Sequence, residues 1–269
     1  MKHLLTCTNE ELVLLVGLCG HARFTKMLID GLTGEKSLKE WEAIVDTTVH
    51  QLMLKQIWDE ERNKRNEIPL SDEMQKFIHS YVNSKWIIRC PNIEKQGVLI
   101  FHYIEESTWL LHLVDREILH EFAYVEQEEI SKLIQDYYSF SDESLDANEQ
   151  FRLTDEAFDL LSEKRNLKKV RKMSTFLEEE GTSFELFIDD LKKNEWFLNN
   201  ISCLHIPSLE DDPLLTDIVF FLPSSKGVWV VKYTDDQTAP VLIQLKGLEQ
   251  WHALLENVGH TASLINEEG

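Results

Sequence analysis

Hydrophobic residues recur at helical spacing through the N-terminal third of the chain. Thr8-Asn9-Glu10-Glu11 has the Ser/Thr-x-x-Glu form that satisfies the free amides of a helix start, and the apolar residues that follow predict a first helix as far as Gly20. Similar patterns begin at Ser37 and at Ser71, where each serine precedes apolar residues three or four positions apart. The pattern therefore predicts three helices in this part of the chain.

The region between the second and third helices adds an order of elements that resembles the winged-helix plan. An extended segment is expected near Lys55–Trp58, just before the basic run Arg62-Asn63-Lys64-Arg65. Acidic residues surround that run, and the helix that begins at Ser71 carries Asp72 and Glu73 on a side that is basic in DNA-binding versions. A solvated loop is therefore favoured over a DNA contact.

Strand periodicity appears in two separate parts of the chain, each time as three β-rich runs followed by an amphipathic helix. Short polar turns separate the runs, which predicts a three-strand meander in each part. The first set comprises Val98–Tyr103, Thr108–Val114, Ile118–Val125 and the helix Glu126–Tyr138. The second set comprises Asp217–Leu222, Val228–Tyr233, Val241–Leu245 and the helix Gly247–Val258. Trp109 and Trp229 occupy matching places in the two middle strands, which favours an internal repeat.

The repeat predicts how the chain is organised into domains. Residues 1–140 form a first pseudo-repeat of helices, meander and helix, and residues 141–269 form a second. The polar and acidic stretch Ser139–Gln150 is the linker or an exposed loop. Two isolated three-strand sheets would leave exposed edges, so we expect the halves to join into one integrated domain. The predicted fold is α+β, with a pseudo-twofold antiparallel sheet flanked by helical groups.

Composition and charge restrict the class of partner. The 269 residues are 43% hydrophobic, which is ample for a substantial core. Lysine and arginine total 27 against 48 aspartates and glutamates, and the resulting formal charge of −21 disfavours nucleic acid and anionic membrane surfaces as partners. The four cysteines lack paired spacing, and Glu10 and Glu11 precede the N-terminal apolar run, where a leader peptide is basic. A cytoplasmic protein without membrane insertion is therefore expected.

Familiar catalytic motifs are missing from the sequence. It contains no Gly-x-Gly-x-x-Gly, no phosphate loop with Gly-Lys-Ser/Thr, no His-Glu-x-x-His and no Gly-x-Ser-x-Gly. Acidic pairs such as Glu105-Glu106 and Asp189-Asp190 fall in turns or on polar helix faces, where a solvated role is favoured over acid–base catalysis. We therefore predict a protein that is not an enzyme and has no cofactor.

Three histidines form the most suggestive local constellation, because the first meander carries one on each strand. Tight turns could place His102, His112 and His120 on one face of the sheet, across strands about 4.8 Å apart, as a row for a metal ion. A register error of one residue would move a member to the other face, and no fourth ligand is evident. A half-exposed polar sheet face is therefore favoured over a zinc site.

An apolar stripe in the second half is a candidate for binding a partner. Phe184, Phe187, Ile188 and Leu191 fall on one helical face, shortly before Trp196-Phe197. Anchors of this kind can receive an amphipathic helix, although most large apolar residues at helical spacing are buried in a core. The candidate partner-binding residues are Phe184, Phe187, Trp196 and Phe197.

Several stretches together resemble one protein family. They are Asn9-Glu10-Glu11-Leu12-Val13-Leu14-Leu15, Leu70-Ser71-Asp72-Glu73-Met74, Val98-Leu99-Ile100-Phe101 and Trp109-Leu110-Leu111-His112-Leu113. With the order of elements over nearly the whole chain, they look like the EspG-type chaperones of type VII secretion, and especially the EsaE-like toxin chaperones of Gram-positive bacteria. The resemblance implies a cytosolic, non-enzymatic chaperone or adaptor that keeps a secreted helical or toxin substrate soluble and delivers it to the secretion machinery.

Three other functions agree with the same residues. In order of preference they are a toxin-neutralising immunity protein, an acidic winged-helix regulator, and an enzyme with an unrecognised site. Copurification with a secreted partner would favour the chaperone, whereas inhibition of a toxin without export would favour immunity. Specific promoter binding at physiological salt would favour the regulator, and turnover of a small molecule would favour the enzyme.

Overall fold

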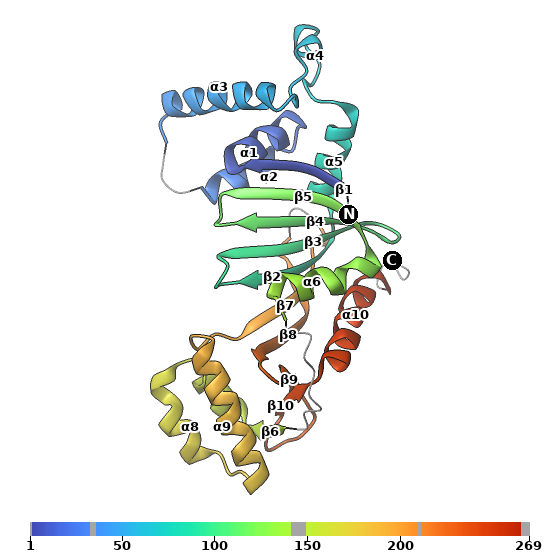
Figure 1. Cartoon of the computed structure of the whole chain (residues 1–269). Coiled ribbons are helices and arrows are strands. Elements are labelled where there is room, and N and C mark those ends of the chain that lie inside the picture. Colours follow the sequence, from blue (N-terminus) through green and yellow to red (C-terminus); the bar gives the residue numbers. More distant parts are fainter. Residues whose placement is uncertain (1, 33–35, 141–148, 209–210, 265–269) are drawn as a thin grey trace. The chain divides into compact units, whose positions relative to one another are not determined.

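The computed structural model divides into two compact units, each of which combines strands with helices (Figure 1). The structure describes residues 2–32, 36–140, 149–208 and 211–264, with side chains described as far as residue 258. The first unit contains Met1–Gln127 and Leu204–Leu214. The second unit contains Glu128–Cys203 and Leu215–Gly269. The predicted α+β class is confirmed.

Five strands of the first unit lie in the order β1-β5-β4-β3-β2, and each is antiparallel to its neighbour. They are β1 (Lys2–Thr8), β2 (Trp86–Asn92), β3 (Gly97–Glu105), β4 (Thr108–Asp115) and β5 (Leu119–Glu126). The predicted meander corresponds to β3, β4 and β5 and is confirmed. The sequence analysis did not predict β1 and β2, which extend the meander on both sides. In β1 the alternation is short, since only Leu5 and Cys7 are buried.

The helices of the first unit are α1 (Asn9–Leu18), α2 (Ala22–Asp30), α3 (Leu38–Leu54), α4 (Glu60–Lys64) and α5 (Asp72–Asn83). Three of them, α1, α3 and α5, begin at the predicted capping residues, whereas α2 and α4 were not predicted. Thr8 and Ser37 form reciprocal capping boxes with Glu11 and Glu40, which satisfy free amides at the starts of α1 and α3. Apolar residues of α1 and α5 pack with those of β1, β4 and β5 into one buried cluster. This cluster is the core of the unit.

Two local predictions in this unit need correction. The first helix ends at Leu18 rather than at Gly20, because the backbone of Gly20 adopts a left-handed conformation with a φ of 83°. The segment Lys55–Trp58 is a turn rather than an extended stretch. The Ile57 amide donates a hydrogen bond of 2.9 Å to the carbonyl of Leu52, so the segment folds back on the C-terminal end of α3.

Five strands lie mainly in the second unit, and their order is β7-β8-β9-β10-β6. The strands are β6 (Gln150–Leu153), β7 (Asn199–His205), β8 (Leu214–Ser224), β9 (Gly227–Tyr233) and β10 (Val241–Lys246). The predicted second meander corresponds to β8, β9 and β10, whereas β6 and β7 were not predicted. Of the predicted linker Ser139–Gln150, residues 141–148 lie outside the described residues, and Gln150 begins a strand that pairs with β10.

Helices cover both faces of this second sheet. They are α6 (Ile130–Tyr138), α7 (Asp155–Leu160), α8 (Leu167–Met173), α9 (Glu178–Lys193) and α10 (Leu248–Leu264). On one face, residues of α7, α8 and α9 share a buried cluster with Trp229 and Val231. On the other face, Phe221 contacts Tyr138 of α6 and Trp251 of α10, with ring centroids 4.8 and 4.9 Å apart. Contacts place α6 in this unit, and the division into pseudo-repeats of residues 1–140 and 141–269 stays a prediction.

Candidate functional site

The C-terminal end of α9 positions the aromatic pair that the sequence singled out. Glutamates in the first turn and lysines in the last turn of α9 both complement the helix dipole. Beyond the helix, Glu195 and Trp196 adopt left-handed backbone, with φ angles of 51° and 71°. The Trp196 amide donates to the carbonyl of Leu191 (2.8 Å), and its indole Nε1 donates to the carbonyl of Leu161 (2.6 Å). The indole is thereby held against α7.

An apolar pocket of about 500 Å³ lies beside this turn. Its apolar lining comes from three parts of the second unit, namely the α7 region, α9 with the turn that follows it, and β8. The residues are Phe158, Leu161, Phe187, Leu191, Trp196, Phe197, Leu198 and Phe220, together with Asp159 and Ser162. The hydroxyl of Ser162 donates to the carbonyl of Asp159, so this polar contact stays local. A pocket with so little polar lining suits an apolar side chain better than a charged ligand.

The four predicted partner-binding residues divide between the core and this pocket. Phe184 is buried and packs on Phe151 and Phe176, away from the pocket lining. Phe187 is also buried, but it forms part of the pocket floor. Trp196 and Phe197 line the pocket, and Phe197 is 45% exposed. Their role in binding a partner stays a prediction.

The sequence analysis missed the rest of the pocket lining. Phe158 and Leu161 follow the capping residue Thr154 at helical spacing, which was the signal that could have placed them on one face. Phe220 belongs to β8 and reaches the pocket only through the pairing of the second sheet. Such a contribution depends on tertiary structure and leaves no local signal.

Asp190 corrects the prediction of a solvated acidic pair. Asp189 is exposed and interacts with Lys192, which lowers the pKa of its carboxyl, whereas Asp190 is buried. The Asp190 Oδ2 accepts a hydrogen bond of 3.1 Å from the indole of Trp229, and its Oδ1 lies 2.9 Å from the ammonium of Lys193. The charge is therefore paired on both oxygens, and it fastens α9 to β9.

The histidines of the first meander do share a sheet face, but they are buried rather than half exposed. Tyr81 of α5 covers the row, with its ring centroid 5.1 Å from that of His102 and 5.5 Å from that of His112. His112 lies 2.8 Å from His120 and 3.4 Å from His102 between ring nitrogens. Among the described residues, no group of three or more His, Cys, Asp or Glu is arranged to hold a metal ion.

Asn9 lies at one end of the histidine row and fixes the tautomer of all three imidazoles. The side-chain amide of Asn9 donates to the carbonyl of Glu117 (2.7 Å), which turns its Oδ1 toward His120 Nε2 at 2.6 Å. Because an amide oxygen only accepts, His120 carries its proton on Nε2 and accepts from His112 on Nδ1. In the same way, His112 carries its proton on Nε2 and accepts on Nδ1 from the Nε2 of His102. This leaves His102 Nδ1 as a buried lone pair without a partner among the described residues.

Burial keeps all three imidazoles neutral. It lowers the pKa of His102 to about 3 and that of His120 to about 4. The pKa of His112 falls well below its usual value through burial and through the two neighbouring imidazoles. A neutral, oriented chain of this kind ties three strands to the start of α1 and offers little acid–base chemistry near neutral pH.

Comparisons with known proteins identify a family and a fold. The family model described as "Uncharacterised protein YfjC" matches residues 35–250. No curated protein matches the chain. The solved structure of the Mycobacterium tuberculosis type VII secretion system chaperone EspG5, in complex with the PE25–PPE41 dimer, is similar with a TM-score of 0.56 and 8% sequence identity over 94% of each chain. The predicted EspG-like fold is thus supported by structure. In the described part of the chain, no helix combines the length and apolarity needed to cross a membrane.

Proposed function

Because the chain belongs to the family of the uncharacterised protein YfjC, we propose that this family member is a cytoplasmic, non-enzymatic chaperone or adaptor for a secreted helical protein or toxin. The observation that carries the proposal is the fold similarity to EspG5 over 94% of both chains. EspG5 is described as a type VII secretion chaperone in complex with the PE25–PPE41 dimer. By analogy, the partner of this chain is a helical substrate of type VII secretion.

The apolar pocket is the proposed docking site for that partner. Phe197 is partly exposed at its wall, and Phe187 and Leu191 supply a buried floor. An amphipathic helix presents apolar residues three or four positions apart, and several such side chains together could occupy a pocket of about 500 Å³ as anchors. The net charge of −21 would keep the complex soluble while the partner's apolar surface is covered.

Co-expression tests the proposal directly. The chain is produced together with each secreted helical protein encoded beside its gene, and the soluble fraction is purified through a tag on the chain. We expect one of these proteins to copurify and to be insoluble when it is expressed alone. If none of them binds, or if the partner is equally soluble alone, the chaperone function is wrong.

A matched pair of variants tests the docking site. Phe197→Asp places a charge at the pocket wall and should weaken partner binding by at least about tenfold, since a buried apolar anchor contributes about 2 kcal/mol or more. Leu177→Asp makes the same change at an exposed residue at the opposite end of α9 and should bind normally. Equal binding by both variants would place the docking surface elsewhere.

A further inference from the structure

The strands β8 and β9 pair over only part of their length. Their register runs from Ser224–Gly227 to Phe220–Val231 and stops there, although β8 continues back to Leu214. β9 also continues, and its last residue Tyr233 still pairs with β10. The two strands therefore separate beyond Phe220, and on that side neither has a strand partner among the described residues.

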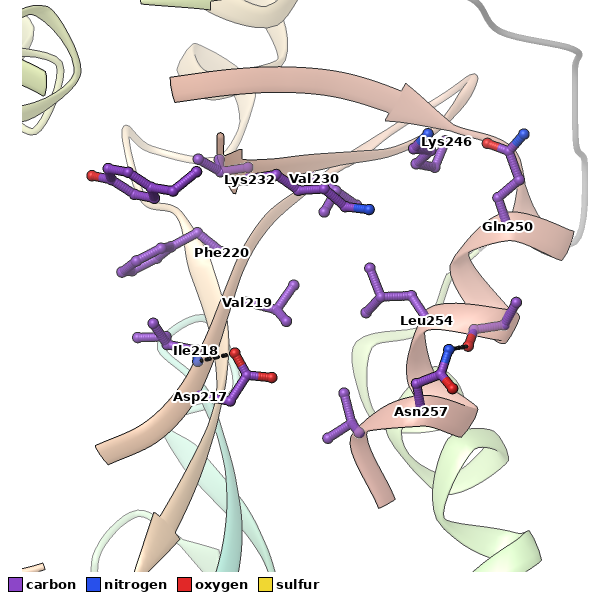
Figure 2. Close-up of a pocket in the computed structure, with 14 residues that line it drawn as sticks. Asp217, Ile218, Val219, Phe220, Val230, Lys232, Lys246, Gln250, Leu254 and Asn257 are labelled. Atoms are coloured by element: carbon purple, nitrogen blue, oxygen red, sulfur yellow. Dashed lines mark hydrogen bonds between the residues drawn. The ribbon is translucent and has the colours of Figure 1, made fainter. Parts of the chain in front are cut away.

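A groove of about 740 Å³ occupies the separation, and α10 closes it on one side (Figure 2). Side chains from both faces of the two strands line it, among them Ile218 and Val219 of β8 and Val230 and Val231 of β9. Alternate residues of a strand point to opposite faces, so the groove enters the sheet between the strands rather than lying on one surface. Figure 2 shows Val219 and Leu254 of α10 facing each other across it.

In the separated part of β8, a side chain takes the place of a strand partner for one backbone amide. The amide of Ile218 donates to the side-chain Oδ1 of the preceding Asp217 at 2.8 Å (Figure 2). A carboxylate that satisfies the amide in this way occupies the place of a backbone carbonyl from a neighbouring strand. An incoming extended chain could replace it, because the side chain of Asp217 is exposed to solvent.

Two lysines outnumber the one carboxylate of the groove lining, that of Asp217, so the groove has a charge opposite to that of the whole chain. Lys232 of β9 and Lys246 of β10 both line it, and within the described residues neither ammonium has a carboxylate partner. Burial lowers the pKa of Lys246, and the positive charge of Lys232 lowers it further, so the two cations repel each other. An acidic side chain placed between them would remove that repulsion.

We propose that this groove binds an extended, acidic segment of another protein by β-strand addition. The segment pairs its backbone with the free edge of β8, places apolar side chains against Val219 and Leu254, and directs a carboxylate toward Lys232 and Lys246. This site goes beyond the proposed function, since it shares only Phe220 with the apolar pocket.

Binding of a synthetic peptide to the full chain tests the proposal. The probe is the acetylated and amidated heptapeptide Val-Thr-Glu-Thr-Val-Thr-Glu, whose valines and glutamates share one strand face because Val219, Lys232 and Lys246 share one face of the sheet. Its binding is followed by calorimetry and by amide hydrogen exchange. We expect saturable binding below about 1 mM, with slower exchange in β8 at Ile218 and Val219. The same peptide with a central proline, which removes a backbone donor, should not bind. No saturation below about 1 mM, or equal binding of the proline peptide, overturns the proposal.

Charge reversal tests the role of the lysines. The double variant Lys232→Glu and Lys246→Glu should bind the valine–glutamate peptide at least about tenfold more weakly and should prefer a valine–lysine peptide. The control, Lys168→Glu and Lys172→Glu, makes the same change in net charge on the exposed face of α8 and should bind like the wild type. The Phe197→Asp variant should also bind the peptide normally, which separates this site from the apolar pocket. Equal weakening by both double variants would overturn the lysine contact.

Discussion

The strands β4 and β8 are both flanked by neighbours in their sheets, yet they differ in how completely they are paired. All eight residues of β4 pair with β5 and with β3, whereas five of the eleven residues of β8 pair with β9. β4 also carries His112, whose imidazole is bonded on both nitrogens. A strand paired on both sides has no backbone left for a partner, so the first sheet is built for rigidity and the second keeps a place for an added strand.

The largest predicted effect is a loss of stability of the first unit when the pH is lowered. The histidine row stays neutral in the folded chain down to about pH 4, while the same residues in the unfolded chain take up protons below about pH 6.5. The unfolded state then binds more protons, so the free energy of unfolding falls as the pH falls from 7 to 5. The expected loss is about 2 kcal/mol per histidine.

Denaturant unfolding at several pH values measures that loss. His102→Gln keeps a donor toward His112 and removes one titrating group, so the pH-dependent loss should shrink by about a third. Gln51→Ala, at an exposed and non-titrating position of α3, should leave the slope unchanged. An identical slope in both variants would mean that the buried row does not control the pH dependence.

Truncation of a core residue should distinguish the paired sheet from the open strand. Phe122 is fully buried in β5 and stacks on His112 with ring centroids 4.3 Å apart, so Phe122→Ala should lower the free energy of unfolding by about 3–5 kcal/mol. Val219→Ala in the open part of β8 should cost about 1 kcal/mol or less, because Val219 is only partly buried. Equal losses in urea denaturation would contradict the contrast between the two strands.

Removing the charge of Asp190 should lower the free energy of unfolding moderately. Asp190→Asn keeps the shape and an acceptor for the Trp229 indole but weakens the interaction with Lys193, so we expect a loss of about 1–2 kcal/mol. Thermal unfolding followed by tryptophan fluorescence measures it. Asp189→Asn, at the exposed neighbour, is the control and should change stability by less than about 0.5 kcal/mol. A larger loss of stability at Asp189 would mean that Asp189, rather than Asp190, fastens α9 to β9.

The smallest effect on stability is expected at Asp217. Asp217→Ala removes the acceptor for the Ile218 amide at an exposed strand edge, so stability should change by less than about 0.5 kcal/mol. Hydrogen exchange at Ile218 should nevertheless become faster, while exchange at Leu111 in the paired strand β4 should not change. An unchanged rate at Ile218 would mean that another group protects this amide.

Local signals explain the parts of the fold that the sequence predicted. The capping boxes at Thr8 and Ser37 and the two meanders depend on residues a few positions apart, so their patterns are visible in the chain. β1 and β2 were missed because polar residues outnumber apolar ones in β1, and because Arg89 and Pro91 interrupt the apolar run of β2. Their assignment depends on pairing with β5 and β3.

The candidate sites were less predictable, because they depend on residues that are distant in sequence. The sequence placed one histidine on each strand, but their burial requires Tyr81 from α5. The sequence predicted a solvated Asp190, because its hydrogen-bond partner Trp229 comes from the distant strand β9. Neither the pocket contribution of Phe220 nor the separation of β8 from β9 follows from local pattern, since both depend on where strand pairing stops.

The position of β1 has a consequence for synthesis on the ribosome. Its residues emerge long before those of β5, yet Lys2 pairs with Tyr124 and Cys7 pairs with His120. The strand therefore has no partner until the whole of β5 has left the exit tunnel, and its closing contacts span most of the first unit. Until then, the apolar side chains of Leu5 and Cys7 are without their core, so the nascent first unit is expected to complete its fold late and in one cooperative step.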